Sequence, residues 1–146
     1  MTTVRQLLDR KDRAVFSVGP ETPVLEAIRA MAEHHIGALL VMKGEKLVGM
    51  LSERDYTRKV MLRGKKSSET KVSDIMSTNL TVTSPSEGVE ECLRAMTDKR
   101  FRHLPVVDGG KVIGVVSIGD LVKYVISCQS ATIAHLESYI SGGYSG

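Results

Sequence analysis

Two short stretches of this sequence place polar groups at the same regular spacing: glycine, two apolar residues, serine, two variable residues and aspartate. The first runs from Gly49 to Asp55 and the second from Gly114 to Asp120. A hydroxyl followed three residues later by a carboxylate is typical of a capping box, in which both side chains bind free N–H groups at a helix start. Spacing alone therefore predicts two helix starts, each preceded by an apolar strand.

The same geometry also suits a ligand. The N-terminus of a helix attracts phosphate through its free N–H groups and its dipole. A serine hydroxyl can donate to a phosphate oxygen, and a carboxylate can accept hydrogen bonds from the two hydroxyls of a ribose. These groups fit a ribose 5-phosphate, whereas no base or nucleophile is spaced to converge with them for bond cleavage. We therefore predict a binding site and assign no catalytic residue.

Both patterns belong to a longer internal repeat. Residues 15–62 align with residues 80–127 without a gap at an offset of 65, and the identities include Pro20 with Pro85 and Glu26 with Glu91. A repeat of this length predicts two related units with two related clefts. Because a unit of about 65 residues buries little surface by itself, we expect the two copies to share one core.

Each copy is predicted to fold as β-α-β-β-α, which places the chain in the α+β class. The first strands are expected at residues 15–18 and 80–83, and the hairpins at 38–51 and 103–116, where apolar runs flank glycine-containing turns. Helical spacing of apolar residues follows each first strand, with Thr22 expected as the N-cap and Pro23 as the first helical residue. A second helix is expected after Ser52 and after Ser117.

The chain is expected to divide into three parts. A short helical lead-in precedes each repeat, at residues 3–8 and 70–76, so that the first repeat spans 1–64 and the second, with a short linker, spans 65–128. Residues 129–146 are expected to form a helical extension and a frayed tail. The apolar stripe of the last helix has no counterpart in the first repeat, so it is expected to pack on its own chain or on a second subunit.

Composition argues against several classes of protein. The 146 residues are 42% hydrophobic with a net charge of +3, and no apolar run approaches the roughly 18 residues of a membrane span or resembles a signal peptide. A cytoplasmic protein is therefore expected. Cys92 and Cys128 lack paired spacing, so no disulfide is predicted. The four histidines lack metal-ligand spacing, so no metal is predicted.

Positive charge is concentrated in residues 54–71, which contain seven basic and two acidic side chains. This stretch is either a solvated helix end and linker or an attraction for a phosphorylated ligand or an acidic partner. Arg54 is expected to contact phosphate and Lys59 to be solvated. Nucleic-acid binding is disfavoured, because aromatic residues for stacking are few and no helix-turn-helix or zinc module is evident. A protein-interaction adaptor without nucleotide dependence stays as the alternative.

The repeat, the paired Gly-x-x-Ser-x-x-Asp patterns and the segment Arg102-His103-Leu104-Pro105-Val106-Val107-Asp108 resemble a tandem pair of cystathionine-β-synthase (CBS) domains, also called a Bateman module. The resemblance covers residues 4–128 and is closest to the stand-alone type. It implies two repeats packed about a pseudo-twofold axis, with clefts that bind AMP, ADP or ATP, or in some members NAD(H) or S-adenosylmethionine. It also implies a flat homodimer and a non-catalytic sensor that signals to a protein partner by conformational or oligomeric change.

Carried over position by position, the resemblance defines two clefts, named here after their aspartates. The Asp55 cleft would use Met50, Ser52, Arg54, Asp55, Ser77, Thr78, Leu80, Thr81, Phe101, Arg102 and His103. The Asp120 cleft would use Arg13, Val15, Phe16, Ile36, Gly37, Ala38, Val115, Ser117 and Asp120. Basic groups near the expected phosphate distinguish the Asp55 cleft, which we expect to prefer the more highly phosphorylated ligand. The Asp120 cleft is expected to accept a smaller or less charged ligand, or none, unless Arg13 or a charge from a partner subunit compensates.

Overall fold

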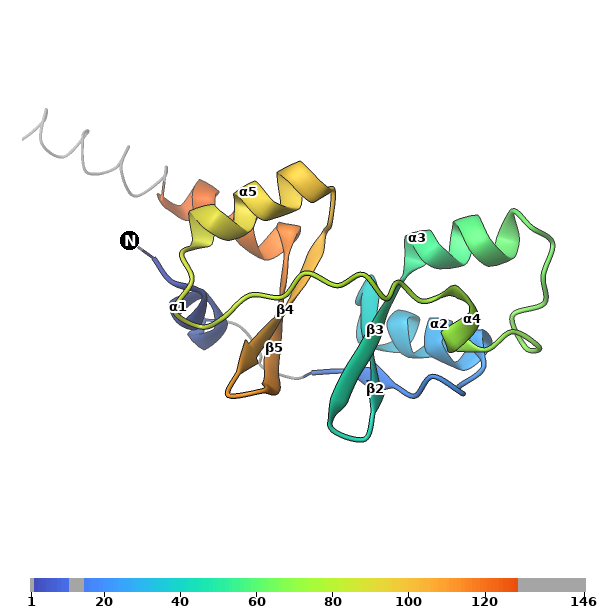
Figure 1. Ribbon diagram of the computed structural model, residues 1–146. Coiled ribbons are helices and arrows are strands. Elements are labelled where there is room, and N and C mark those ends of the chain that lie inside the picture. The colour runs from blue at the N-terminus through green and yellow to red at the C-terminus, as the bar shows by residue number, and fades with distance from the viewer. Residues whose placement is uncertain (1, 11–14, 129–146) are drawn as a thin grey trace, which may run out of the picture.

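The computed structural model describes residues 2–10 and 15–128 as two units of similar construction that lie side by side (Figure 1). The first contains β1 (Ser17–Val18), α2 (Val24–His34), β2 (Ala38–Lys43), β3 (Lys46–Ser52) and α3 (Glu53–Tyr56), which continues into the π-helical turn η1 (Thr57–Met61). The second contains α5 (Val89–Lys99), β4 (His103–Asp108) and β5 (Lys111–Ser117), followed by helical residues 118–128. The predicted α+β class is confirmed. The predicted extension at 129–146 lies outside the described residues.

The hairpins of the two units have the same register. Ala38 pairs with Ser52 in the antiparallel β2–β3 pair, and the equivalent His103 pairs with Ser117 in β4–β5. A helix follows each serine directly, as expected. The repeat therefore brings two serines, each with its helix start, to equivalent ends of two equivalent hairpins.

The first strand differs between the two units. β1 runs parallel to β2, and Leu40 donates its backbone N–H to the Phe16 carbonyl oxygen (3.3 Å). The strand expected at residues 80–83 is wrong, because in the described chain this segment forms only an isolated parallel bridge, between Thr83 and Val106. Pro105 stands where the first unit has Leu40. Proline has no N–H to donate to the equivalent carbonyl, so the strand cannot extend.

The buried apolar residues do not form the single shared core that we expected. In the described chain all of the buried hydrophobic residues except Leu40 form two separate clusters, one in each unit. The first cluster also contains Val72 and Ile75 of α4 (Val72–Ile75), the helix that precedes the second repeat. The second cluster contains Val4, Leu7 and Leu8 of α1 (Val4–Asp9), the helix that precedes the first. Each lead-in helix therefore completes the core of the other repeat, and this exchange joins the two units.

Two glycines allow the exchanged segments to come close to the hairpins. A Cβ on Gly49 would lie 2.5 Å from Sδ of Met76, and one on Gly114 would lie 2.9 Å from Cδ2 of Leu8. Met76 and Leu8 are equivalent residues at the ends of the two lead-ins. The glycine that opens each Gly-x-x-Ser-x-x-Asp pattern therefore lets a lead-in side chain pack closely against the strand.

The start of α2 also differs from expectation. Pro23, not Thr22, is the N-cap, and it makes no side-chain capping bond. The Thr22 hydroxyl oxygen instead accepts a hydrogen bond from the Gly19 N–H (3.2 Å). The N–H of Val24 donates to the carbonyl of Thr70 (2.8 Å), which lies just before α4. The Thr70 carbonyl therefore accepts a hydrogen bond from a backbone N–H at the start of α2, and this bond links α2 to the exchanged lead-in.

Replacing Gly114 with alanine tests the close approach of α1 to the second hairpin. The added Cβ meets the Leu8 side chain inside a packed core, so we expect the free energy of unfolding to fall by about 1–3 kcal/mol. Gly37→Ala is the matched control, because a Cβ there would meet nothing nearer than 3.9 Å. Urea denaturation measures both variants. Equal unfolding free energies for the two would contradict the packing of α1 against β5.

Candidate functional site

Both Ser-x-x-Asp patterns form the expected capping boxes. In the first, the Ser52 N–H donates to Oδ2 of Asp55 (3.0 Å), and the Asp55 N–H donates to Oγ of Ser52 (3.2 Å). In the second, the Ser117 N–H donates to Oδ2 of Asp120 (2.9 Å), and the Asp120 N–H donates to Oγ of Ser117 (3.1 Å). One carboxylate oxygen of each aspartate is thus used by the helix start.

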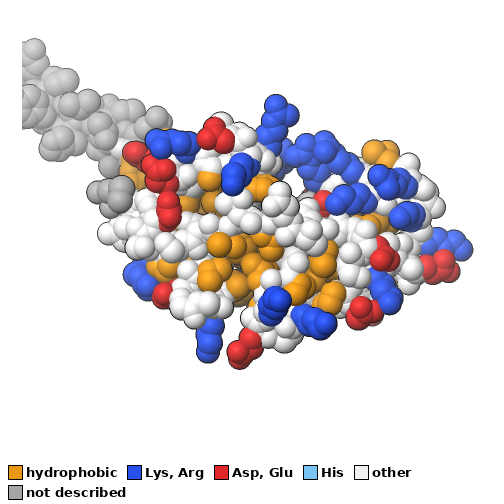
Figure 2. Space-filling model, viewed as in Figure 1, with side chains coloured by type: hydrophobic (Ala, Val, Ile, Leu, Met, Phe, Trp, Pro, Cys, Tyr) orange, Lys and Arg blue, Asp and Glu red, His pale blue; other side chains and the backbone are white. Residues whose placement is uncertain are grey.

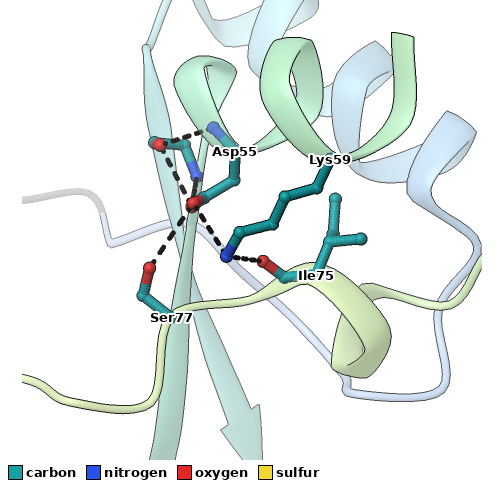
Figure 3. A network of polar contacts seen from close by, with 5 residues as sticks. Asp55, Lys59, Ile75 and Ser77 are labelled. Atoms are coloured by element: carbon teal, nitrogen blue, oxygen red, sulfur yellow. Dashed lines mark hydrogen bonds and ion pairs between the residues drawn. The ribbon is translucent and has the colours of Figure 1, made fainter. Parts of the chain in front are cut away.

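The second carboxylate oxygen of Asp55 faces one group on the next turn of its own helix, Lys59, and one from the segment after α4, Ser77 (Figure 3). Oγ of Ser77 lies 3.5 Å from Oδ1, and Nζ of Lys59 lies 3.4 Å from it. Nζ of Lys59 also donates to the backbone carbonyl of Ile75, the last residue of α4, at 2.9 Å. Asp55 is therefore connected through Lys59 to the lead-in helix that completes the first core.

The expectation that Lys59 is simply solvated is wrong. The exchange of lead-in helices brings the end of α4 beneath η1, where the lysine side chain can reach its last carbonyl. The equivalent residue of the second repeat is Tyr124, and its hydroxyl donates to Oγ1 of Thr2, just before α1. In both repeats this position fastens the second helix to the exchanged lead-in.

The Asp55 cleft is a cavity of about 420 Å³ between the two units. All of its predicted residues line it except Thr78. Further lining residues that the sequence analysis missed are Gly37, Ala38, Glu53, Arg58, Asn79, Lys99 and Arg100. A sequence signal existed for Arg58, one helical turn after Arg54, and for Lys99 and Arg100, which directly precede Phe101.

The Asp120 cleft has a similar size, about 400 Å³. Seven predicted residues line it, whereas Val15 does not and Arg13 lies outside the described residues. Those seven are Phe16, Ile36, Gly37, Ala38, Val115, Ser117 and Asp120. Further lining residues that were missed are Leu8, His34, His35, Leu40, Met50, His103 and Gly114. The rings of Phe16 and His34 are stacked, with centroids 3.9 Å apart and an interplanar angle of 18°.

The two clefts are neighbours with a common wall. Gly37, Ala38, Met50 and His103 line both of them. Their charge differs, because the Asp55 cleft is lined by five Lys and Arg side chains and the described lining of the Asp120 cleft contains neither residue type. Figure 2 shows basic side chains gathered along the upper edge, beside α3, and apolar side chains gathered over the middle of the molecule.

Clusters of metal ligands and membrane-spanning helices are both absent from the part of the chain that the structure describes. No group of three or more His, Cys, Asp or Glu side chains there is placed to hold a metal ion. No helix within residues 2–10 and 15–128 is long and apolar enough to cross a membrane.

Comparison with known proteins identifies the family. A family model described as "CBS domain" matches residues 4–62 and again residues 72–127. This chain therefore belongs to the CBS-domain family, whose members are generally regulatory, non-catalytic modules.

Similar proteins include two curated relatives and several solved structures. The chain is 42% identical over 126 residues to the mitochondrial CBS domain-containing protein CBSX3 of Arabidopsis thaliana, covering 83% of this chain and 61% of that relative. It is 33% identical over 123 residues to the CBS domain-containing protein YhcV of Bacillus subtilis, covering 84% of this chain and 87% of that relative. The chain thus spans less than two thirds of the Arabidopsis protein and most of the Bacillus one.

Among solved structures, a protein with CBS domains from Burkholderia ambifaria is 48% identical, with a TM-score of 0.84 over 86% of this chain and 95% of that chain. The CBS domain pair of protein MJ0100, solved with 5′-methylthioadenosine and S-adenosyl-L-methionine, is 23% identical, with a TM-score of 0.76 over 86% of this chain and 97% of that chain. This second likeness shows a shared fold.

Replacing Lys59 with methionine tests the connection between Asp55 and α4. The variant keeps the aliphatic stem but loses both the hydrogen bond to Ile75 and the ion pair with Asp55, so we expect a loss of about 1 kcal/mol in unfolding free energy. Arg58→Met, a neighbouring change that leaves both contacts in place, is the control. Chemical denaturation followed by circular dichroism measures the difference. Identical midpoints for the two variants would contradict a stabilising role for Lys59.

Proposed function

We propose that this chain is a non-catalytic sensor that binds adenosine-containing nucleotides in the clefts between its two repeats. The observation that carries the proposal is the position of Asp55. Its side chain is 15% exposed and stands at a helix start inside a cavity of about 420 Å³ lined by five basic side chains. A cavity of this volume lies within the usual range for small-molecule sites.

The groups in the Asp55 cleft fit the three parts of a nucleotide. Oδ1 of Asp55 makes two long contacts, at 3.4 and 3.5 Å, with Lys59 and Ser77. Ribose hydroxyls would replace these contacts with hydrogen bonds to the same oxygen. Met50, Leu80 and Phe101 offer an apolar surface to the base. Ser52 and the basic side chains would face the phosphates, since arginine binds phosphate oxygens through paired N–H groups.

The Asp120 cleft repeats the ribose-binding pattern. Ser117 and Asp120 stand at its helix start, and Phe16, Ile36 and Leu40 supply the apolar surface. The MJ0100 domain pair, which shares this fold, was solved with two adenosine compounds. The candidate ligands for this chain are accordingly AMP, ADP and ATP, with NAD(H) and S-adenosylmethionine also in the class.

A signal would arise if the ligand prefers one arrangement of the molecule. The Asp55–Lys59–Ile75 connection offers a route, because a ribose that takes Oδ1 of Asp55 competes with Lys59, which also holds the end of α4. Since α4 completes the first core and leads into the second repeat, its displacement would change how the two repeats meet. We propose that a homodimer in the cytoplasm passes this change to a protein partner.

Ligand binding tests the proposal directly. We expect AMP, ADP or ATP, but not GTP, to raise the thermal midpoint of the protein, because a ligand at 100 times its dissociation constant adds about 2.7 kcal/mol of stability. That gain corresponds to a rise of several degrees. The double variant Asp55→Asn, Asp120→Asn should lose the rise, because an amide cannot accept hydrogen bonds through both of its polar atoms. Thermal shift followed by calorimetric titration measures the effect.

Asp74→Asn is the control, because Asp74 accepts a hydrogen bond from the Lys71 N–H at the start of α4 and lines neither cleft. It therefore tests whether a changed helix cap alone alters binding. Folded protein that responds to no adenosine compound would contradict the proposal. It would leave Ser-x-x-Asp as a helix cap and favour the alternative of a protein-interaction adaptor.

A further inference from the structure

We infer that the two clefts take adenosine ligands of different charge: the Asp55 cleft a nucleotide with two or more phosphates, and the Asp120 cleft an adenosine derivative without phosphate. The inference rests on the proposed function and names the residues that would make each cleft select a ligand of different charge. It is carried by two equivalent wall segments. Residues 99–103 read Lys-Arg-Phe-Arg-His in the Asp55 cleft, and residues 34–38 read His-His-Ile-Gly-Ala in the Asp120 cleft.

The wall of the Asp55 cleft carries more positive charge than a monophosphate can neutralise. Its basic side chains come from two parts of the fold. Arg54 and Arg58 lie on the helix after β3, whereas Lys99 ends α5 and Arg100 and Arg102 follow it. The acidic residues in the same lining are Glu53 and Asp55. Across the described residues, the four arginines form no ion pair, and Lys99 donates only to Oγ1 of Thr81 (3.3 Å).

These free guanidinium groups set the ligand charge that the cleft favours. Each arginine presents a planar pair of donors to phosphate oxygens, and such charge-assisted bonds are the stronger kind. A diphosphate or triphosphate offers more charge and more oxygen atoms than a single phosphate to the arginines on the two sides of the cleft. The wall therefore favours the longer phosphate chain.

Four of the five equivalent positions in the second cleft carry no Lys or Arg, and the fifth, Lys123 in place of Arg58, does not line the Asp120 cleft. His34 replaces Lys99, His35 replaces Arg100 and Gly37 replaces Arg102. Gly119 likewise stands where the first repeat has Arg54.

The polar Thr81–Lys99 contact of one wall is replaced in the other by stacked aromatic rings, those of Phe16 and His34. Rings of this kind pack against flat or apolar groups and add contact area without fixed charge. An adenosine with an apolar or neutral 5′ substituent suits this wall.

The backbone offers a clean way to remove one cation. Arg100 and His35 have φ values of 59° and 55° and close α5 and α2 in the left-handed region, where glycine is favoured. Arg100→Gly therefore removes a guanidinium group and relaxes the backbone at the same time. A loss of binding in this variant cannot be attributed to a strained fold.

The first experiment compares Arg100→Gly, Arg102→Gly double-variant protein with the wild type by calorimetric titration of ATP and of adenosine. We expect ATP to bind the variant at least about tenfold more weakly, as for the loss of one charge-assisted contact or more, and adenosine to bind within about twofold of wild type. Lys43→Gln, Lys46→Gln is the control for net charge. It removes two positive charges from the adjoining ends of β2 and β3, outside both clefts.

The reciprocal experiment places charge in the other wall. The background variant is Asp55→Asn, which removes the ribose-binding carboxylate of the Asp55 cleft. In this background, the double substitution His34→Lys, His35→Arg should raise ATP affinity at the Asp120 cleft by about tenfold. Both positions are exposed, so the fold should tolerate them. The background protein itself should bind adenosine or 5′-methylthioadenosine more tightly than ATP.

The outcomes separate the inference from the proposed function. ATP binding that is unchanged in the first variant, or weakened together with adenosine, would overturn the division by charge and leave the proposed function standing. An Asp55→Asn protein that prefers ATP to adenosine would do the same. Wild-type protein that binds no adenosine compound would overturn the proposed function, and the inference with it.

Discussion

The exchange of lead-in helices is the constraint on which the rest of this structure depends. Val4, Leu7 and Leu8 belong to the core of the second repeat, and Val72 and Ile75 belong to that of the first. Neither repeat is complete by its own residues, because burial of these side chains supplies part of each core. The relative position of the repeats, and therefore of the walls of both clefts, follows from two short helices that cross from one unit to the other.

Core packing and cleft chemistry use the same stretch of chain. The glycine of each Gly-x-x-Ser-x-x-Asp pattern accepts Leu8 or Met76, and the serine and aspartate a few residues later cap the helix that borders the cleft. Leu8 itself also lines the Asp120 cleft. A shift of a lead-in helix would therefore move the strand that carries the Gly-x-x-Ser-x-x-Asp pattern, and with it the serine and aspartate that border the cleft. The hairpin backbones and the capping boxes are alike in the two repeats. The charge of the two cleft linings differs, because single residues differ at equivalent positions, such as Arg102 and Gly37.

Local pattern predicted the hairpins and the helix starts after Ser52 and Ser117, because these features depend on residues close together in sequence. The cleft residues, which are far apart in sequence, came from the family resemblance. The exchange could not be predicted from the same information. Residues 3–8 and 70–76 resemble each other, but their likeness does not say which repeat each one packs against. The error at residues 80–83 had a readable cause in Pro105, whose missing N–H shortens the strand. Lys99 and Arg100 were missed because their approach to the cleft depends on the left-handed turn that ends α5.

The exchange also orders the events of protein synthesis. The core of the first repeat can close once residues 72–75 have left the ribosome, shortly after the rest of that repeat. α1 is made first but finds its partners, which extend to Leu121, only when most of the chain exists. During that interval Val4, Leu7 and Leu8 stay exposed, a condition in which nascent chains associate wrongly or need chaperones. Residues 4–8 therefore reach their place only after much of the later chain has been made, and their removal would leave the core of the more distant repeat incomplete.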